Sequence, residues 1–174
     1  MPAFAARYTL ELNPADTKIR WTLSDVLHTV SGTFDLKHGS IEFDPETGGA
    51  SGRITVNVAS GNSGNRVRDR RMHASVLESS RYPEATFVPD RIYGAAAVPG
   101  TSNFKLHGIL TIHGVPHEMT VGVQMTATSN QVNATIKFEI PYVAWGMNDP
   151  GNFLLKVGKT VRVSIEISGF LQRP

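Results

Sequence analysis

The chain has 174 residues, a formal net charge of +2 at pH 7 and no cysteine. This length predicts a single domain, residues 1–174, that can bury a core, and the lack of cysteine excludes disulfides, thiolate catalysis and thiolate metal sites. The charge is too mild to indicate a nucleic-acid partner, and no run approaches the roughly 18 apolar residues of an integral membrane segment.

Alternation of apolar and polar residues predicts strands along most of the chain. The first strands are short, and they are expected at residues 8–11, 18–23, 30–36, 41–43 and 54–58, with another beginning at Ala85. Four longer strands follow, at residues 102–112, 117–127, 131–142 and 160–170. Turn residues rather than helical stretches separate most of these strands, which favours antiparallel hairpins over parallel crossovers.

Each predicted strand has one apolar face, so the sheet must pack on a second sheet or close on itself as a barrel. Strands of about ten residues are longer than the usual five or six, which favours a tall barrel. We therefore expect an all-β fold, an extended eight-stranded antiparallel barrel. The interior of such a barrel is either filled by side chains or wide enough for one small ligand, and the alternation alone is compatible with both.

The segment Asn57–Pro89 interrupts this pattern. Residues 65–73 contain helix formers, with Asn65 as an N-cap and with Met72 and Val76 four apart on one face. We expect a short helical insert here that caps one end of the barrel. The spacing of a serine at position 75 and a glutamate at position 78 resembles a capping box, which predicts a second helical turn over residues 75–80.

The insert concentrates arginine at four positions, Arg66, Arg68, Arg70 and Arg71. Guanidinium groups could hold the phosphate of a ligand through paired, charge-assisted hydrogen bonds. The alternative is surface solvation, because these four positions spread around a helix, and Arg68 could pair with Asp69 or with another carboxylate.

Four motifs occur in order along nearly the whole chain. They are SGNSGNRVRD at residues 60–69, YPEATF at residues 82–87, LTIHG at residues 110–114, and VGKTVRVSIEI at residues 157–167. Together they resemble the YceI-like family of lipocalin-like isoprenoid-binding proteins. The resemblance implies a lipocalin-like barrel whose apolar channel takes up a polyisoprenoid or similar lipid, in a carrier and not an enzyme.

The chain departs from the family pattern in two places. Family members are often periplasmic, whereas the start MPAFAARYTL lacks the basic and apolar regions of a secretory signal. We therefore expect a cytoplasmic protein as the sequence is written, or a periplasmic one if a signal segment was removed. The second departure is Met72–Leu77, where aromatic residues often stand in the family, so the resemblance leaves the lid contacts and the ligand open.

Catalytic and metal sites are weakly indicated. His113 and His117 lie four apart, but Gly114 and Pro116 place them at a turn, where their geometry is unspecified. The residues 149–152 are more typical of a β-turn than of a calcium loop. No nucleophile elbow, phosphate loop or carboxylate pair is present, so we predict no catalytic residue, no metal and no cofactor.

We predict that the protein binds, and carries or stores, one long-chain lipid such as an isoprenoid quinone, a prenyl phosphate or a fatty amide. The candidate ligand-binding residues are Trp21, Phe34, Arg68, Asp69, Met72, Phe87, Phe104, Leu106, Leu110, Ile136, Phe138, Trp145 and Met147. Of these, Trp145 and Met147 could line the lumen or plug the barrel end. The alternatives are a solid barrel that serves in stress response or binds a protein through its surface, and a lipid-modifying isomerase or cyclase. The sequence leaves a homodimer open.

Overall fold

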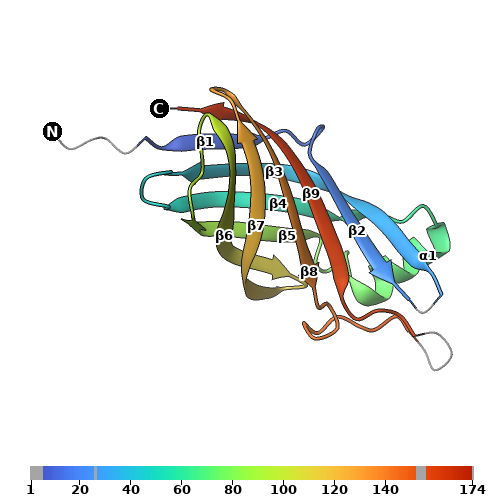
Figure 1. The fold of residues 1–174 in the computed structure, drawn as a ribbon. Coiled ribbons are helices and arrows are strands. Elements are labelled where there is room, and N and C mark those ends of the chain that lie inside the picture. The colour runs from blue at the N-terminus through green and yellow to red at the C-terminus, as the bar shows by residue number, and fades with distance from the viewer. Residues whose placement is uncertain (1–5, 26, 152–155, 174) are drawn as a thin grey trace.

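The computed structural model describes residues 6–25, 27–151 and 156–173. Nine strands and one helical insert make up the described chain (Figure 1). The strands are β1 (Tyr8–Leu12), β2 (Lys18–Ser24), β3 (Thr29–Phe43), β4 (Ala50–Asn62), β5 (Glu84–Tyr93), β6 (Gly100–Ile112), β7 (Val115–Ala127), β8 (Gln131–Ile140) and β9 (Val161–Gln172). No helix in the described part of the chain is long and apolar enough to cross a membrane.

The strands form one antiparallel sheet in the order β1-β3-β2-β9-β8-β7-β6-β5-β4, and pairing of β3 with β4 closes it. Both β1 and β2 lie between β3 and β9. β2 pairs with the first part of β3, where Ile19 faces Phe34, and β1 pairs with its last part, where Leu10 faces Ile41. The two short strands therefore share one position, and the closed barrel has eight positions. The predicted eight-stranded antiparallel barrel is confirmed.

The third strand corrects the sequence-based boundaries. Residues 30–36 and 41–43 were expected to form two strands, but β3 runs unbroken from Thr29 to Phe43. The polar residues between them hide the continuity, because the pairing with β4 shifts register between Leu36 and His38 and leaves Lys37 as the extra residue of a bulge. A bulge interrupts the alternation of side chains without ending the strand.

The insert contains α1 (Arg66–Arg71), which continues into the π-helix η1 (Met72–Val76). The predicted N-cap is confirmed, because the Asn65 side chain accepts a hydrogen bond of 3.0 Å from the backbone N–H of Arg68. The predicted capping box and second turn over residues 75–80 are wrong. Position 75 lies inside η1, and Glu78 has a φ of 46°, which ends the helical geometry instead of beginning a new turn.

Two groups of buried side chains fill the barrel interior at different heights. The larger group, here called the main core, contains Leu10, Leu12, Ile19, Leu36, Ile41, Phe43, Ile92, Ala96, Leu106, Val121, Val123, Met125, Ala127, Val132, Ala134, Ile136, Ile167 and Leu171. The smaller group, here called the lid cluster, is built on Val76, Ile140, Tyr142 and Met147. The main core occupies the end near β1, and the lid cluster lies at the opposite end, which carries α1 (Figure 1).

Candidate functional site

An apolar cavity of about 550 Å³ opens at the end of the barrel that carries α1. This volume falls within the roughly 300–1,000 Å³ of small-molecule sites. Its wall comes from β2, β3, the helical insert, the last residues of β6 and β8, the loop after β8 and the start of β9. The lining residues are Trp21, Leu23, Asp25, Val30, Phe34, Asn65, Val67, Arg68, Arg71, Met72, Val76, Leu77, Ile112, Ile140, Tyr142, Met147, Pro150, Val157, Val161 and Val163.

Trp21 and Phe34 line the cavity from neighbouring strands, with ring centroids 6.4 Å apart. Trp21 is paired across the ladder with Gly32, and a Cβ at that glycine would lie only 2.4 Å from the indole Cζ2. Gly32 therefore lets the indole lie directly over the neighbouring backbone. Phe34 and Val163 also pack against the main core, so they mark the height at which the interior changes from filled to hollow.

The helical insert covers the cavity with Met72 and Val76, which share one face as the sequence predicts. Side-chain hydrogen bonds tie this lid to the barrel at three places. His73 bonds both to Ser79 and to the carbonyl oxygen of Gly61, each at 2.8 Å. The His113 ring bonds to the Glu78 carboxylate at 2.6 Å. The Asn148 side-chain amide donates to the carbonyl oxygen of Ser75 at 2.8 Å. The lid is thus a fixed part of the site.

The loop after β8 closes the other side of the cavity. Tyr142 donates a hydrogen bond of 2.7 Å to the carbonyl oxygen of Gly158, and burial raises the pKa of its hydroxyl to about 12, so it stays a neutral donor. Met147 is buried and lines the cavity. Trp145 packs in the lid cluster and stacks on the His117 ring at 3.7 Å, and burial lowers the pKa of that histidine.

Two arginines stand at the cavity opening, and the structure distinguishes them. Arg68 donates from Nε to the Ser63 hydroxyl at 2.9 Å and from Nη2 to the Ser63 carbonyl oxygen at 3.1 Å. Asp69 accepts from the hydroxyl and the backbone N–H of the same serine, at 2.5 and 2.9 Å. Arg68 and Asp69 therefore meet through Ser63 instead of pairing directly. Arg71 has no ion pair among the described residues.

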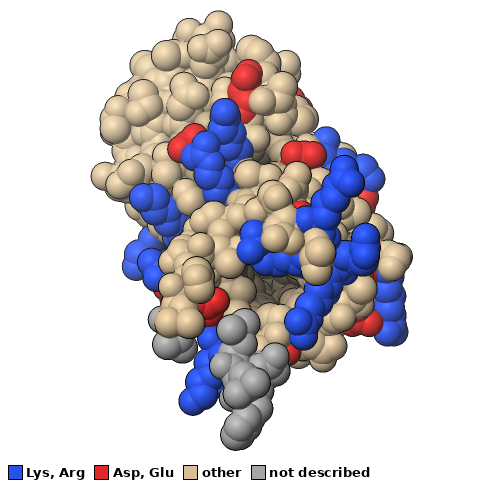
Figure 2. Space-filling model, turned by 90° about the vertical axis from the view of Figure 1, so that its right-hand side faces the viewer, with Lys and Arg blue, Asp and Glu red and all other residues tan. Residues whose placement is uncertain are grey.

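Positive charge gathers beside this opening. Figure 2 looks at the end that carries α1 and shows a hollow with several Lys and Arg side chains along part of its rim. Asp25 also lines the opening, where the backbone N–H groups of His28 and Leu27 hold the pKa of its carboxyl below the ordinary value. An anionic group entering the cavity would pass these basic side chains first.

The sequence-predicted ligand residues lie at different positions along the barrel axis, and only some of them line the cavity. Trp21, Phe34, Arg68, Met72 and Met147 line the cavity. The other eight do not line it: Asp69 turns to Ser63, Phe87, Phe104, Leu106 and Ile136 lie in or against the main core, and Leu110, Phe138 and Trp145 pack in the lid cluster. Sequence reasoning missed other lining residues, among them Val161 and Val163, although their alternation already indicated an inward position.

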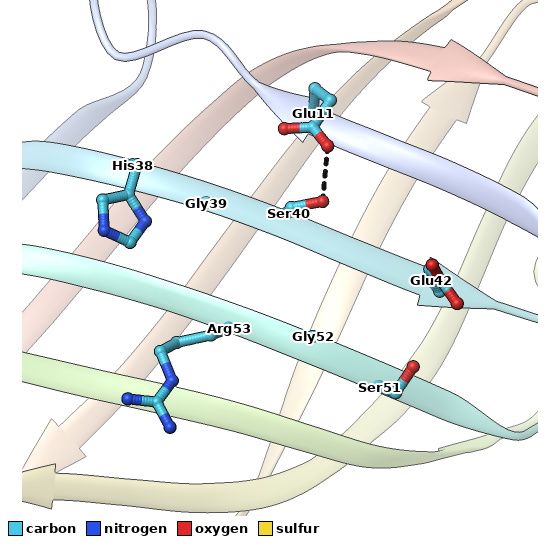
Figure 3. Close-up of a pocket in the computed structure, with 8 residues that line it drawn as sticks. All are labelled: Glu11, His38, Gly39, Ser40, Glu42, Ser51, Gly52 and Arg53. Atoms are coloured by element: carbon cyan, nitrogen blue, oxygen red, sulfur yellow. Dashed lines mark hydrogen bonds between the residues drawn. The ribbon is translucent and has the colours of Figure 1, made fainter.

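A second, shallow hollow lies on the outer surface of β1, β3 and β4 (Figure 3). Its lining is mainly polar and includes the Ser40 hydroxyl, which donates to Glu11 at 2.5 Å. The described residues contain no group of three or more His, Asp or Glu side chains that could hold a metal ion. His113 and His117, whose spacing indicated a metal site only weakly, have different partners: the first bonds to Glu78 and the second stacks on Trp145. The apolar cavity is therefore the candidate site.

An eight-position antiparallel barrel with one apolar cavity at its end belongs to the class of lipocalin-like barrels. A model of the YceI-like domain matches residues 10–169, and the chain belongs to the YceI-like family. The predicted membership is confirmed. A UPF0312 protein of Vibrio parahaemolyticus is 24% identical over 131 residues, which cover 74% of this chain and 67% of that protein.

Solved structures share the fold. BcnA of Burkholderia cenocepacia has a TM-score of 0.74 and 20% identity, over 90% of this chain and 98% of that one. A polyisoprenoid binding domain of Saccharophagus degradans, implicated in plant cell wall breakdown, has a TM-score of 0.72 and 18% identity, over 94% and 97% of the two chains. The YCEI protein of Campylobacter jejuni has a TM-score of 0.68 and 19% identity, over 83% and 86%.

Proposed function

We propose that this protein binds one long-chain isoprenoid or similar lipid, with the hydrocarbon chain in the apolar cavity, and carries or stores it without chemical change. The observation that supports the proposal most directly is the cavity itself, about 550 Å³ in volume and walled mainly by Val, Leu, Ile, Met and aromatic side chains. The similar fold of a polyisoprenoid binding domain from Saccharophagus degradans points to the same ligand class.

The energetics favour a long chain. Burial of one methylene contributes about 0.8 kcal/mol, so a five-carbon isoprene unit contributes up to ~4 kcal/mol. Association costs an estimated ~4 to 15 kcal/mol in lost freedom, so several units must be buried before binding becomes favourable. A short apolar molecule would leave much of the cavity wall uncovered, and would bind weakly.

The opening favours a polar or anionic head group that stays near the lid. Arg71 lines the cavity and has no ion pair among the described residues, whereas the guanidinium of Arg68 is already bonded twice to Ser63. We therefore assign the head-group contact to Arg71, and a positioning role to Arg68, which keeps α1 attached to the end of β4. Quinone, prenyl phosphate and fatty amide head groups all offer oxygen acceptors for such a contact.

The solid-barrel alternative applies to only part of the molecule. The main core fills the end near β1, but the interior beneath the lid is hollow. A lipid-modifying activity is less favoured, since the described lining residues include no histidine and only one carboxylate, that of Asp25. The similar fold of the polyisoprenoid binding domain from Saccharophagus degradans also points to binding rather than to catalysis.

Native mass spectrometry followed by organic extraction tests the proposal. The purified protein is expected to carry a lipid or to take up one equivalent of an isoprenoid quinone or prenyl pyrophosphate, with a rise in Tm. Trp21 lines the cavity and Trp145 is the only other tryptophan, so a Trp145→Phe variant reports binding through Trp21 fluorescence alone. The proposal fails if no lipid co-purifies and neither compound changes the Tm or this fluorescence.

A further inference from the structure

Two large apolar side chains project into solvent at the cavity end of the barrel. Leu27, in the turn between β2 and β3, is 77% exposed, and Val67, on α1, is 75% exposed. Val67 also lines the cavity opening, and Leu27 lies between the lining residues Asp25 and Val30. The exposed apolar groups therefore flank the opening from two different elements.

The same end carries a concentrated positive charge. Four arginines and one aspartate give α1 a net charge of +3, whereas the whole chain carries +2, so the remainder of the molecule is net −1. Arg66 and Arg70 are exposed and have no ion pair among the described residues. Figure 2 shows Lys and Arg side chains gathered beside the hollow at this end of the molecule. The charge of the molecule is thus strongly asymmetric.

Exposed apolar side chains within a basic surface are the features by which peripheral proteins bind membranes. The apolar groups enter the boundary between head groups and acyl chains, and each Lys or Arg near an anionic leaflet adds attraction. Leu27 and Val67 both project outward into solvent. Such side chains fit a fluid bilayer surface better than the preformed pocket of a folded partner.

We propose that the surface formed by Leu27, Arg66, Val67 and Arg70, here called the docking face, binds the surface of an anionic phospholipid bilayer. This inference rests on the proposed function in one respect, because a long-chain lipid ligand resides in a bilayer. Contact through the docking face turns the cavity opening toward the membrane, so that a lipid chain passes between bilayer and cavity without crossing water. The asymmetry of charge orients the approach.

Cosedimentation with sucrose-loaded vesicles tests the docking face. The vesicles contain phosphatidylcholine alone or phosphatidylcholine and phosphatidylglycerol at a ratio of about 7:3, and no isoprenoid, so the result does not depend on the cavity ligand. The wild-type protein is expected to bind the anionic vesicles more strongly, and raised salt is expected to weaken that binding, because exposed charges are screened. Arg66→Gln/Arg70→Gln is expected to lower the partition coefficient about 25-fold, or about fivefold for each arginine.

Lys105→Gln/Lys137→Gln is the matched control, since it removes two exposed positive charges from β6 and β8, on the outer wall. This control is expected to bind anionic vesicles as the wild type does. Leu27→Ser is expected to weaken binding roughly tenfold at every salt concentration, because the loss is that of an apolar contact.

The proposal is overturned if the wild-type protein binds anionic vesicles no better than neutral ones, or if the lysine control loses as much binding as the arginine variant. Binding of the wild type to an acidic polypeptide such as polyglutamate, without binding to anionic vesicles, would assign the basic surface to an acidic protein and also overturn the proposal. Arg66 and Arg70 do not line the cavity, so titration of both variants with soluble prenyl pyrophosphate separates a loss of docking from a loss of ligand binding.

Discussion

The two ends of the barrel are built by the same strands and differ in what fills them. On β9, Ile167 and Leu171 belong to the main core, whereas Val161 and Val163 line the cavity. At the end near β1, the long side chains of the main core pack together with Ala96, which lies in the loop before β6. At the other end β9 contributes shorter valines, and a helical lid spans the opening instead of filling it. Inward orientation is thus common to both ends, which differ in whether the inward side chains meet across the interior or leave a cavity beneath the lid.

Truncation of a leucine is expected to cost much more in the main core than at the cavity wall. Leu106→Ala should lower the free energy of unfolding by about 2–5 kcal/mol, because Leu106 is buried among packed neighbours. Leu23→Ala should cost about 1 kcal/mol or less, because that side chain already borders empty space and has fewer contacts to lose. Denaturant titration of the two ligand-free variants measures both. Equal losses would mean that the cavity end is as densely packed as the main core.

Enlarging a side chain should have opposite consequences at the two ends. Val161→Trp projects into the cavity and is expected to prevent lipid binding while leaving the Tm of the ligand-free protein near that of the wild type. Val121→Trp, the matched change in the main core, is expected to lower stability by about 1–3 kcal/mol or more, because a filled interior cannot accept added volume. Thermal unfolding and native mass spectrometry distinguish the outcomes. Retained lipid binding in Val161→Trp would place the ligand elsewhere.

The fold was largely predictable from the sequence, since the alternation along β6 to β9 and the N-cap at Asn65 are local signals. The unbroken β3 was not predictable, because its bulge at Lys37 depends on pairing with β4. The sharing of one barrel position by β1 and β2 is likewise a property of their partners β3 and β9.

The candidate site was only partly predictable. Alternation correctly indicates that Phe104 and Ile136 face the barrel interior. It does not indicate their position along the barrel axis, and both lie at the level of the main core. The Ser63 contacts that occupy Arg68 and Asp69 arise from the turn before α1, which sequence spacing does not describe. Composition indicated an arginine-rich lid, but only the three-dimensional arrangement distinguishes Arg71 from its neighbours.

The two arginines at the opening are expected to differ in their effect on ligand affinity. Arg71→Ala should weaken binding of a prenyl pyrophosphate about tenfold or more, since a hydrogen bond to a charged group contributes roughly 1.5–3 kcal/mol, and should affect an uncharged quinone less. Arg68→Ala should lower the Tm and weaken both ligands similarly, because it releases α1 from Ser63. Titration calorimetry with both lipids provides the comparison. Equal losses for the two ligands in Arg71→Ala would contradict a head-group contact.

The smallest effect is expected on the outer wall of the filled part of the barrel, where His107 bridges two strands. Its Nδ1 lies 2.6 Å from Asp90 of β5, and its Nε2 lies 2.7 Å from Glu118 of β7. Both ring nitrogens can donate only in the imidazolium form. The hydrogen bond to Asp90, followed by that to Glu118, accordingly raises the pKa of His107 above its ordinary value near 6.5.

Because folding raises this pKa, the stabilisation should be complete below the unfolded-state pKa of about 6.5 and should disappear as the pH rises through the higher folded-state value. His107→Gln is therefore expected to lower the Tm relative to the wild type near pH 6, by an amount that shrinks toward pH 9. His38→Gln, which removes a histidine that makes no ion pair among the described residues, should show no such trend. A difference that stays constant with pH would assign His107 a purely steric role. Lipid binding should be unchanged in both variants, because neither histidine lines the cavity, so the rigid wall and the binding end respond independently.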